Sequence, residues 1–445
     1  MENAAEEDFG TKDIRKLLIK QAVPASIGIL FMTVNILVDT IFVGRWIGPQ
    51  AIAALTVVSP VVFIIASIGL AIGIGGSSVI SRAFGEKDSE TAHATFAHQI
   101  MMAFGLTMLF VVIGFCFSDQ MLTLFGAKGN LLAPAKLFLF PILAAAPFMA
   151  FIIMGNGVMR AEDRSKFAMI VTMISAVANI ILDILLIKVL NLGIPGAAYA
   201  TAFSYVIAFG YIFWFFRSKS SLKLQWKHFT FRPKLFKEIS GLSLSPFSRQ
   251  SVISILSILL NHVLFAHGGE HSVTIYGIIS RLLMFALFPV SGITEGFLPI
   301  AGFNYGAKKY DRVREIIVTA IKYAGFIAIL IYSAILIFAP QITAVFTDDQ
   351  TVIRDTPNAL RWVFAASPVI AVQLIGSAYF QAAGKASKAL LLTLTKQGFF
   401  LIPLILVLPR YFGIFGVWIS FPIADVLATS VTGFFLWKEM KQNLK

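Results

Sequence analysis

Long apolar segments recur along the whole chain and are separated by short polar connections. Each is about 20 residues or longer, which is the length that an α-helix needs to cross the hydrocarbon core of a bilayer. The pattern predicts an all-α polytopic membrane protein, because helices satisfy their backbone hydrogen bonds internally. Twelve membrane-spanning helices are expected, at 22–44, 52–80, 96–118, 136–159, 166–188, 196–216, 245–267, 273–303, 315–340, 358–382, 389–409 and 413–437.

Composition agrees with this class, since 58% of the 445 residues are hydrophobic and only 13% are charged. The net charge of +13 follows the topology. With the N-terminus in the cytoplasm, roughly 25 of the 36 Lys and Arg residues fall in cytoplasmic loops, which is the positive-inside bias. We therefore expect both termini to be cytoplasmic, a plasma (inner) membrane location, and no nucleic-acid partner.

The two halves of the chain carry the same marks at an offset of about 220–222 residues. Six spans in each half would give both halves the same orientation, with a pseudo-twofold axis along the membrane normal. This organisation is typical of alternating-access transporters that bind substrate between two lobes, although two similar bundles could also form a static pore. The matched marks are Pro24 and Pro246, Asp39 and Asn261, Gly75 and Gly296, Gly85-Glu-Lys and Gly306-Ala-Lys, Ala146-Pro147 and Ser367-Pro368, Arg160-Ala161 and Gln381-Ala382, and 192–196 and 412–416.

The predicted domains follow from this repeat. Residues 1–216 form an N-terminal lobe with six spans, 217–244 form a cytoplasmic connecting loop, and 245–445 form a C-terminal lobe with six spans.

Polar residues interrupt three spans of the first half at the same spacing. Asn35 and Asp39, Asn179 and Asp183, and Ala197 and Thr201 are each four residues apart, so both members of a pair lie on one helix face. A carboxylate inside a membrane span is costly and is kept where it has a partner or a function. The three pairs therefore predict one polar site between three helices.

The second half lacks these acids. Asp39 is replaced by Asn261, and the counterparts of the other site residues are Phe399, Pro403, Val417 and Phe421. Only Glu295 and Asp425 remain as further acids within spans. Asp425 has no basic residue one turn away on its own helix, and we expect structural roles for both. The sequence thus predicts an acidic site in the first half alone.

Several short motifs resemble the multidrug and toxic compound extrusion (MATE) family, and more closely its DinF-like branch. The resemblance covers all twelve spans, and the motifs occur in the family's order. They are Asn-x-x-x-Asp at 35–39 and 179–183, Gly-x-x-x-x-Ile-Ser-Arg-x-x-Gly at 75–85, Leu-Gly-Ile-x-Gly-Ala-Ala at 192–198 and Tyr-Gly-Ile-x-x-Arg at 276–281.

The resemblance implies a secondary antiporter that moves protons or sodium inward as organic, often cationic and lipophilic, compounds move outward. It implies a coupling site with Asp39, Asp183, Asn179 and Thr201 as side-chain ligands and Ala197 as a backbone ligand. Asn156 is then a further polar residue of the same pocket, and Pro24 is the proline at which the first span bends. Asn35, Asn156, Asn261 and Gln373 are the candidates for lining the substrate cavity.

The implied ligands are all oxygen atoms, which suits a hard cation such as Na⁺. Two carboxyl groups close together at low dielectric also retain a proton strongly. The residues do not distinguish a proton from sodium. No cofactor is expected, and we expect a monomer with small-molecule substrates.

Other functions fit the sequence less well. A flippase for lipid-linked precursors would need extra spans and a basic cavity, and a solute importer ranks below it. A membrane enzyme would need clustered His, Cys or Ser with acids, and the six His residues are scattered. No Gly-Lys-Ser/Thr nucleotide-binding motif is present.

Overall fold

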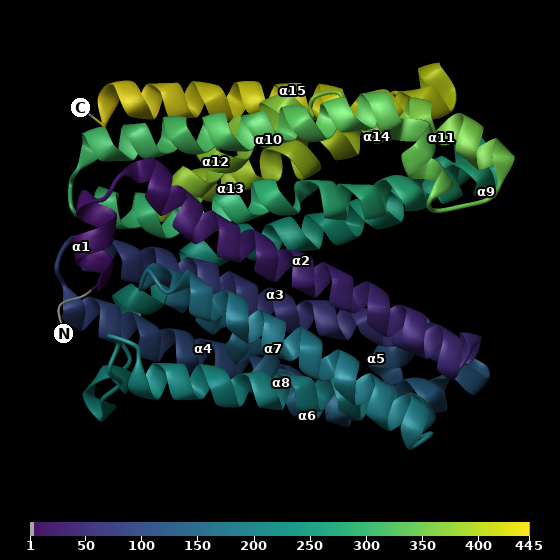
Figure 1. The fold of residues 1–445 in the computed structure, drawn as a ribbon, viewed down its shortest axis with the longest axis horizontal. Helices are drawn as coiled ribbons and strands as arrows, with labels where there is room; N and C mark the ends of the chain where they lie inside the picture. Colours follow the sequence, from purple (N-terminus) through teal and green to yellow (C-terminus); the bar gives the residue numbers. More distant parts are fainter. Residues whose placement is uncertain (1–3, 445) are drawn as a thin grey trace. The chain divides into compact units, whose positions relative to one another are not determined.

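The computed structural model of the protein describes residues 4–444, and no β-strand occurs within that range. Eleven of its helical stretches are long and apolar enough to cross a membrane. The longest, α9, contains a non-helical residue, Gly269 (φ 63°), and therefore holds two of the expected spans. The all-α, twelve-span prediction is confirmed (Figure 1). In chain order the elements are α1 (Ala4–Thr11), α2 (Ile14–Trp46), α3 (Pro49–Gly85), α4 (Ser89–Cys116), α5 (Ser118–Leu124), η1 (Gly129–Leu131), α6 (Leu132–Ala161), α7 (Ser165–Asp183), η2 (Ile184–Val189), α8 (Gly193–Ser218), η3 (Trp226–Phe229), α9 (Pro233–Gly306), α10 (Tyr310–Ala344), α11 (Gln350–Val363), η4 (Ser367–Val369), α12 (Ile370–Ala382), α13 (Ala386–Leu394), η5 (Thr395–Leu401), α14 (Ile402–Val407) and α15 (Pro409–Gln442).

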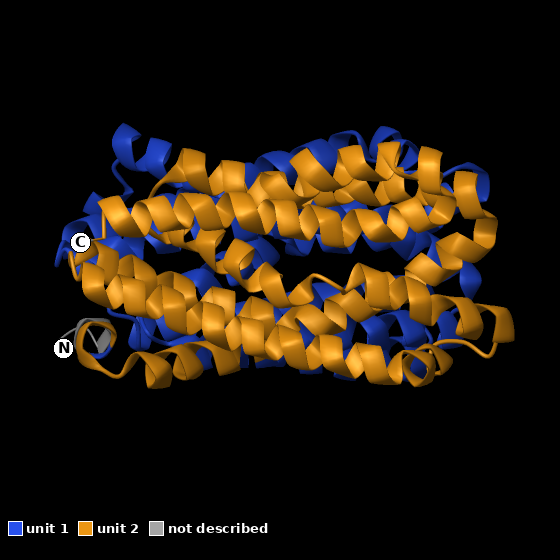
Figure 2. Cartoon of the chain, turned by 90° about the horizontal axis from the view of Figure 1, so that it is seen from above, with its two compact units in different colours: residues 1–8, 27–243 blue, residues 9–26, 244–445 orange. Residues whose placement is uncertain are grey.

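The chain divides into two compact units, shown in different colours in Figure 2. Unit 1 contains 27–243 together with the residues before Phe9, and unit 2 contains 9–26 and 244–445. Helix α2 therefore begins in unit 2 and enters unit 1 after Ser26, whereas α9 begins in unit 1 and enters unit 2 after Ser243. The segment expected to be a connecting loop, 217–244, is helical from Pro233 onward.

In each unit, the helix start that comes from the other half of the chain packs against a glycine. A Cβ atom on Gly75 of α3 would lie 2.8 Å from the carbonyl oxygen of Ile239 and 2.9 Å from the backbone nitrogen of Ser243. A Cβ on Gly296 of α9 would lie 2.8 Å from the backbone nitrogen of Ala22. Only glycine permits such close backbone approach. These are the two glycines that the repeat matched to each other.

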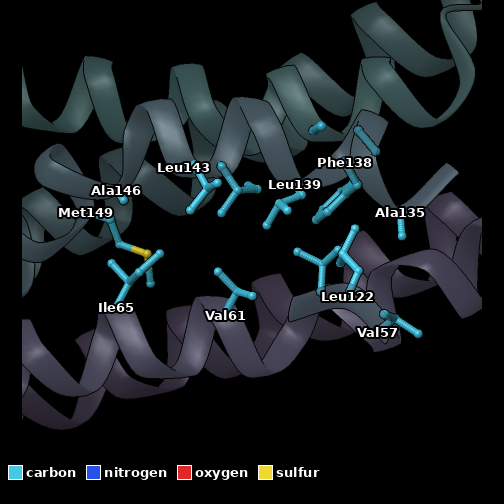
Figure 3. Packing of buried hydrophobic residues seen from close by; sticks show 14 of the residues in the cluster. Val57, Val61, Ile65, Leu122, Ala135, Phe138, Leu139, Leu143, Ala146 and Met149 are labelled. Carbon is cyan, nitrogen blue, oxygen red and sulfur yellow. The ribbon is translucent and has the colours of Figure 1, made fainter. Parts of the chain in front are cut away.

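A packed apolar cluster of unit 1 includes facing residues of α3 and α6, and Figure 3 shows part of it. Val57, Val61 and Ile65 follow one another at four-residue intervals, so they form one face of α3. Leu139 and Leu143 of α6 belong to the same cluster. Small residues hold the two helices close further along, since Gly69 and Gly73 of α3 approach the backbone of Ala150 and Met154. In lipid, such close packing is the main attraction between helices.

The Gly-Ile-x-Gly motif that occurs in both halves has one conformation in both. Gly193 and Gly413 adopt positive φ angles of 61° and 57°, which side-chain-bearing residues rarely adopt. Three residues later, Gly196 and Gly416 lie against the end of the preceding helix, because an added Cβ would be 3.0 Å from the Leu186 oxygen and 2.6 Å from the Leu408 oxygen, respectively. The repeated sequence thus encodes a tight entry into the sixth span of each half.

Candidate functional site

The centre of the predicted site is the end of α7. Asp183 is the last residue of this α-helix and is completely buried. The backbone then widens into a π-helical stretch, η2. Such π-helical turns are rare and occur most often at functional sites, because they expose backbone groups and shift side chains out of the regular register.

Helix α8 carries Ala197, the residue expected to provide a backbone ligand. Gly193 and Gly196 bring the first turn of α8 against η2, which buries Ala197 completely. The hydroxyl of Thr201, one turn later, donates a hydrogen bond to the carbonyl oxygen of Ala197 (3.1 Å). A carbonyl oxygen has a second lone pair, so this one can still face a cation.

A chain of hydrogen bonds joins the three predicted helices. The Asn35 side-chain amide in α2 donates to Oδ1 of Asn179 in α7 (2.7 Å). The Asn179 amide in turn donates to Oγ1 of Thr201 in α8 (3.4 Å). The structure therefore brings the three sequence pairs together within unit 1, with the amide of Asn179 in the middle.

The carboxyl groups of Asp39 and Asp183 interact electrostatically at close range. Within the described part of the chain, no donor group pairs with Oδ1 of Asp39 or with either oxygen of Asp183, although these atoms are buried. Two buried carboxylates at close range repel, and burial of an uncompensated charge is costly. A proton or a small cation between them removes both costs, so the arrangement is suited to bind one and release it.

The sequence pattern of the MatE family matches residues 24–185 and, a second time, residues 247–407. The chain belongs to the MatE family of multidrug and toxic compound extrusion (MATE) transporters. The double match confirms that the two halves are repeats, because one pattern describes each of them. The resemblance of the short motifs to the MATE family is confirmed.

Relatives and solved structures agree along nearly the whole chain. The multidrug export protein MepA of Staphylococcus aureus is 26% identical over 420 residues, which is 94% of this chain and 92% of MepA. A MATE crystal structure in the bent conformation is similar with a TM-score of 0.93, at 26% identity and 98% coverage of both chains. A straight conformation matches with a TM-score of 0.91, at 27% identity and 97% coverage of both chains.

Membership in the MATE family identifies the chain as a multi-span membrane transporter for small molecules and not as an enzyme, as the sequence predicted.

Four further candidates were named from the sequence. The Asn156 amide in α6 donates to Oγ1 of Thr172 (3.4 Å), and among the described residues no hydrogen bond links it to the Asn35–Thr201 chain. Pro24 lies in the part of α2 that belongs to unit 2. In unit 2 itself, Asn261 is exposed on α9, whereas Gln373 is buried and donates to the carbonyl oxygen of Leu392 (3.2 Å).

One residue near the carboxyl pair was not anticipated. Tyr205 interacts electrostatically with Asp39 and is partly buried against the core of unit 1. It follows Thr201 by four residues, so it continues the same face of α8 as Ala197 and Thr201. This spacing was the signal that could have identified it.

The structure gives Asp425 of unit 2 a basic partner, although no base lies one turn away on its own helix. The structure pairs it with Lys396 of a neighbouring helix, with Nζ and Oδ1 2.5 Å apart. The second half lacks the acids of the first, but it carries a buried ion pair of its own.

Proposed function

We propose that this protein is a secondary active antiporter that exports chemically diverse organic compounds, often lipophilic cations, in exchange for protons or sodium ions by alternating access. The observation that carries the proposal is the carboxyl pair of Asp39 and Asp183, in which Oδ1 of Asp39 and both oxygens of Asp183 are buried and lack a protein donor among the described residues. Similarity to a protein named as a multidrug exporter supports the choice of substrates. We also propose that the chain belongs to the DinF-like branch and functions as a monomer in the plasma membrane, with both termini cytoplasmic.

The coupling follows from the charges. When a proton or Na⁺ lies between the two carboxyl groups, α2 and α7 can stay close together, and when it leaves, the two negative charges repel. The ion thus favours one arrangement of these helices over another. An antiporter requires that the exported compound favours the opposite arrangement, because a ligand shifts an equilibrium only through its different affinities for the two states.

The neighbouring polar groups have defined roles in this scheme. The Asn179 amide holds Asn35 and Thr201 in register, and the oxygens of Thr201 and Ala197 complete an oxygen-lined site next to the carboxyl pair. For sodium, these oxygens would replace part of the hydration shell. For a proton, the carboxyl pair alone suffices. Pro24 is the proposed bending point of α2.

The test is efflux of a fluorescent lipophilic cation from proteoliposomes, with a sodium gradient and a proton gradient imposed in turn. Wild type, Asp39→Asn and Asp348→Asn are compared, because Asp348 is an exposed acid far along the chain from the site. We expect one gradient to drive wild-type efflux and Asp39→Asn to lower it by about 100-fold or more, which corresponds to roughly 3 kcal/mol.

Asp348→Asn should retain wild-type efflux. The gradient that works identifies the coupling ion. If efflux needs neither gradient, or survives in Asp39→Asn, then Asp39 is a structural residue and a flippase for lipid-linked precursors becomes the better assignment.

A further inference from the structure

A second pair of charged residues lies within the membrane-spanning helices of unit 2. Lys396 belongs to the π-helical stretch η5, and Asp425 belongs to α15. Their side chains are 16% and 5% exposed, with the ammonium 2.5 Å from the carboxyl. Among the residues that the structure describes, Lys396 of η5 is the charged group that interacts with Asp425.

The Lys396 ammonium group has hydrogen-bond donors that the ion pair does not use. An ammonium group has three N–H donors. Within the described residues, Asp425 is the one partner of Lys396. Lysine also remains the more accessible member, while the carboxyl is enclosed. The site therefore presents spare cationic donors, which favour an incoming carboxylate or another anionic oxygen.

Charge balance limits what such a ligand can do. Removing the lysine partner from a buried carboxylate leaves an uncompensated charge, which is strongly destabilising in proteins. The cost disappears if the carboxylate gains a proton as it is released. One anionic group and one proton then enter together, and the net charge of the site does not change.

We propose that Lys396 and Asp425 form an anion-accepting subsite for transported compounds. A carboxylate or similar anionic oxygen of the substrate replaces Asp425 as the partner of Lys396, and Asp425 takes up one proton. The inference rests on the export function proposed above and extends its substrates from organic cations to zwitterionic and anionic amphiphiles.

The experiment uses two dyes with the same aromatic cation. Tetramethylrhodamine ethyl ester is a permanent cation, and tetramethylrhodamine with its free carboxylate is a zwitterion. Efflux of both is measured from proteoliposomes that contain wild type, Lys396→Met or Asp425→Asn. In Lys396→Met we expect efflux of the zwitterion to fall by about tenfold or more, the loss of one charge-assisted hydrogen bond, while efflux of the ester stays within about twofold.

Asp425→Asn should act in the opposite direction. The competing carboxylate is gone, so the purified variant should bind the zwitterion about tenfold more tightly than wild type does. Proton uptake on binding, measured with a pH-sensitive dye in weak buffer, should be one per zwitterion in wild type and absent in Asp425→Asn. An ion pair with a purely structural role would not give opposite effects in Lys396→Met and Asp425→Asn.

A double variant distinguishes a substrate subsite from an ion pair that only stabilises the fold. Replacing both members by apolar residues, as in Lys396→Met with Asp425→Val, restores the stability that a single replacement loses, because buried ion pairs are often replaceable by apolar pairs. We expect this variant to fold and export the ester but not the zwitterion. If it exports both dyes, or if Lys396→Met loses both equally, the subsite is wrong. If wild type fails to export the ester, the export function itself is wrong.

Discussion

The fifth span of each half contains a π-helical stretch, but the charges next to it differ between the two units. In unit 1, Asp183 immediately precedes η2 and faces Asp39, a group of the same charge. In unit 2, Lys396 lies within η5 and pairs with Asp425, a group of opposite charge. Both pairs join two helices of one unit.

The difference determines what each site needs from outside. Two carboxyl groups are stable together only with a proton or cation between them, so an ion gradient can fill or empty the site. A lysine and an aspartate neutralise each other, so only a ligand that replaces one partner can open the pair. Under the two proposals made above, the same scaffold offers one site that responds to ions and one that responds to an anionic ligand.

The largest expected effect comes from making unit 1 resemble unit 2. Asp39→Lys places an ammonium opposite Asp183, at a position that is half-buried. The new pair neutralises itself and no longer needs a proton or sodium. We expect gradient-driven efflux of a lipophilic cation from proteoliposomes to fall to the background of empty liposomes, about 100-fold or more below wild type.

The matched control is Asp39→Glu, which keeps the like-charge pair and should keep efflux coupled to the gradient at a reduced rate. Thermal unfolding of both variants shows whether they fold. Coupled efflux by a folded Asp39→Lys protein would contradict the idea that the like-charge pair is what couples transport to the ion.

Much of this comparison could be predicted from the sequence. Apolar segment length determines the spans, because the bilayer thickness sets the length of a crossing helix. The acid site was also accessible, because Asn35 with Asp39 and Asn179 with Asp183 share one helical spacing, and the structure brings these side chains together. Local periodicity was enough wherever the partners of a residue lie on its own helix face.

The rest depends on which helices pack together, and periodicity within one helix carries no such information. Lys396 and Asp425 are on different helices, so a search at i±4 around Asp425 could not find the pair. The one available signal was the cost of each charge inside an apolar run, which favours pairing of opposite charges between spans. Hydropathy likewise gives no sign that α2 begins in unit 2 and that α9 begins in unit 1.

A smaller effect is expected at the glycines that receive the exchanged helix starts, and it should be similar in the two units. In Gly75→Ala and Gly296→Ala the new methyl group would lie under 3.0 Å from backbone atoms of the packed segment. Overpacking of this kind costs about 1–3 kcal/mol. We expect each variant to unfold several degrees below wild type, at about 2–4 °C per kcal/mol for units of this size.

Gly105→Ala and Gly210→Ala are the controls, because both positions lie in helices and a Cβ there meets no atom within 4 Å. Alanine favours the helix over glycine by up to about 1 kcal/mol, so these two variants should unfold at or slightly above the wild-type temperature. A loss of stability at Gly75 but not at Gly296 would show that the two exchanged segments are not equivalent.

The smallest expected effect concerns Pro24, which lies two residues before α2 passes from unit 2 to unit 1. Proline cannot donate a hydrogen bond to the carbonyl four residues earlier, so the helix bends more easily there. Pro24→Ala restores that donor and stiffens α2 at the crossing. We expect a small rise in the unfolding temperature and about threefold slower gradient-driven efflux, a barrier change of roughly 0.7 kcal/mol. Pro141→Ala is the matched control, because Pro141 interrupts α6 entirely within unit 1. Slower efflux in both variants would show that helix stiffness in general is responsible. Slower efflux in Pro24→Ala alone would assign the bend to α2, the helix that connects the proposed ion site of unit 1 to unit 2.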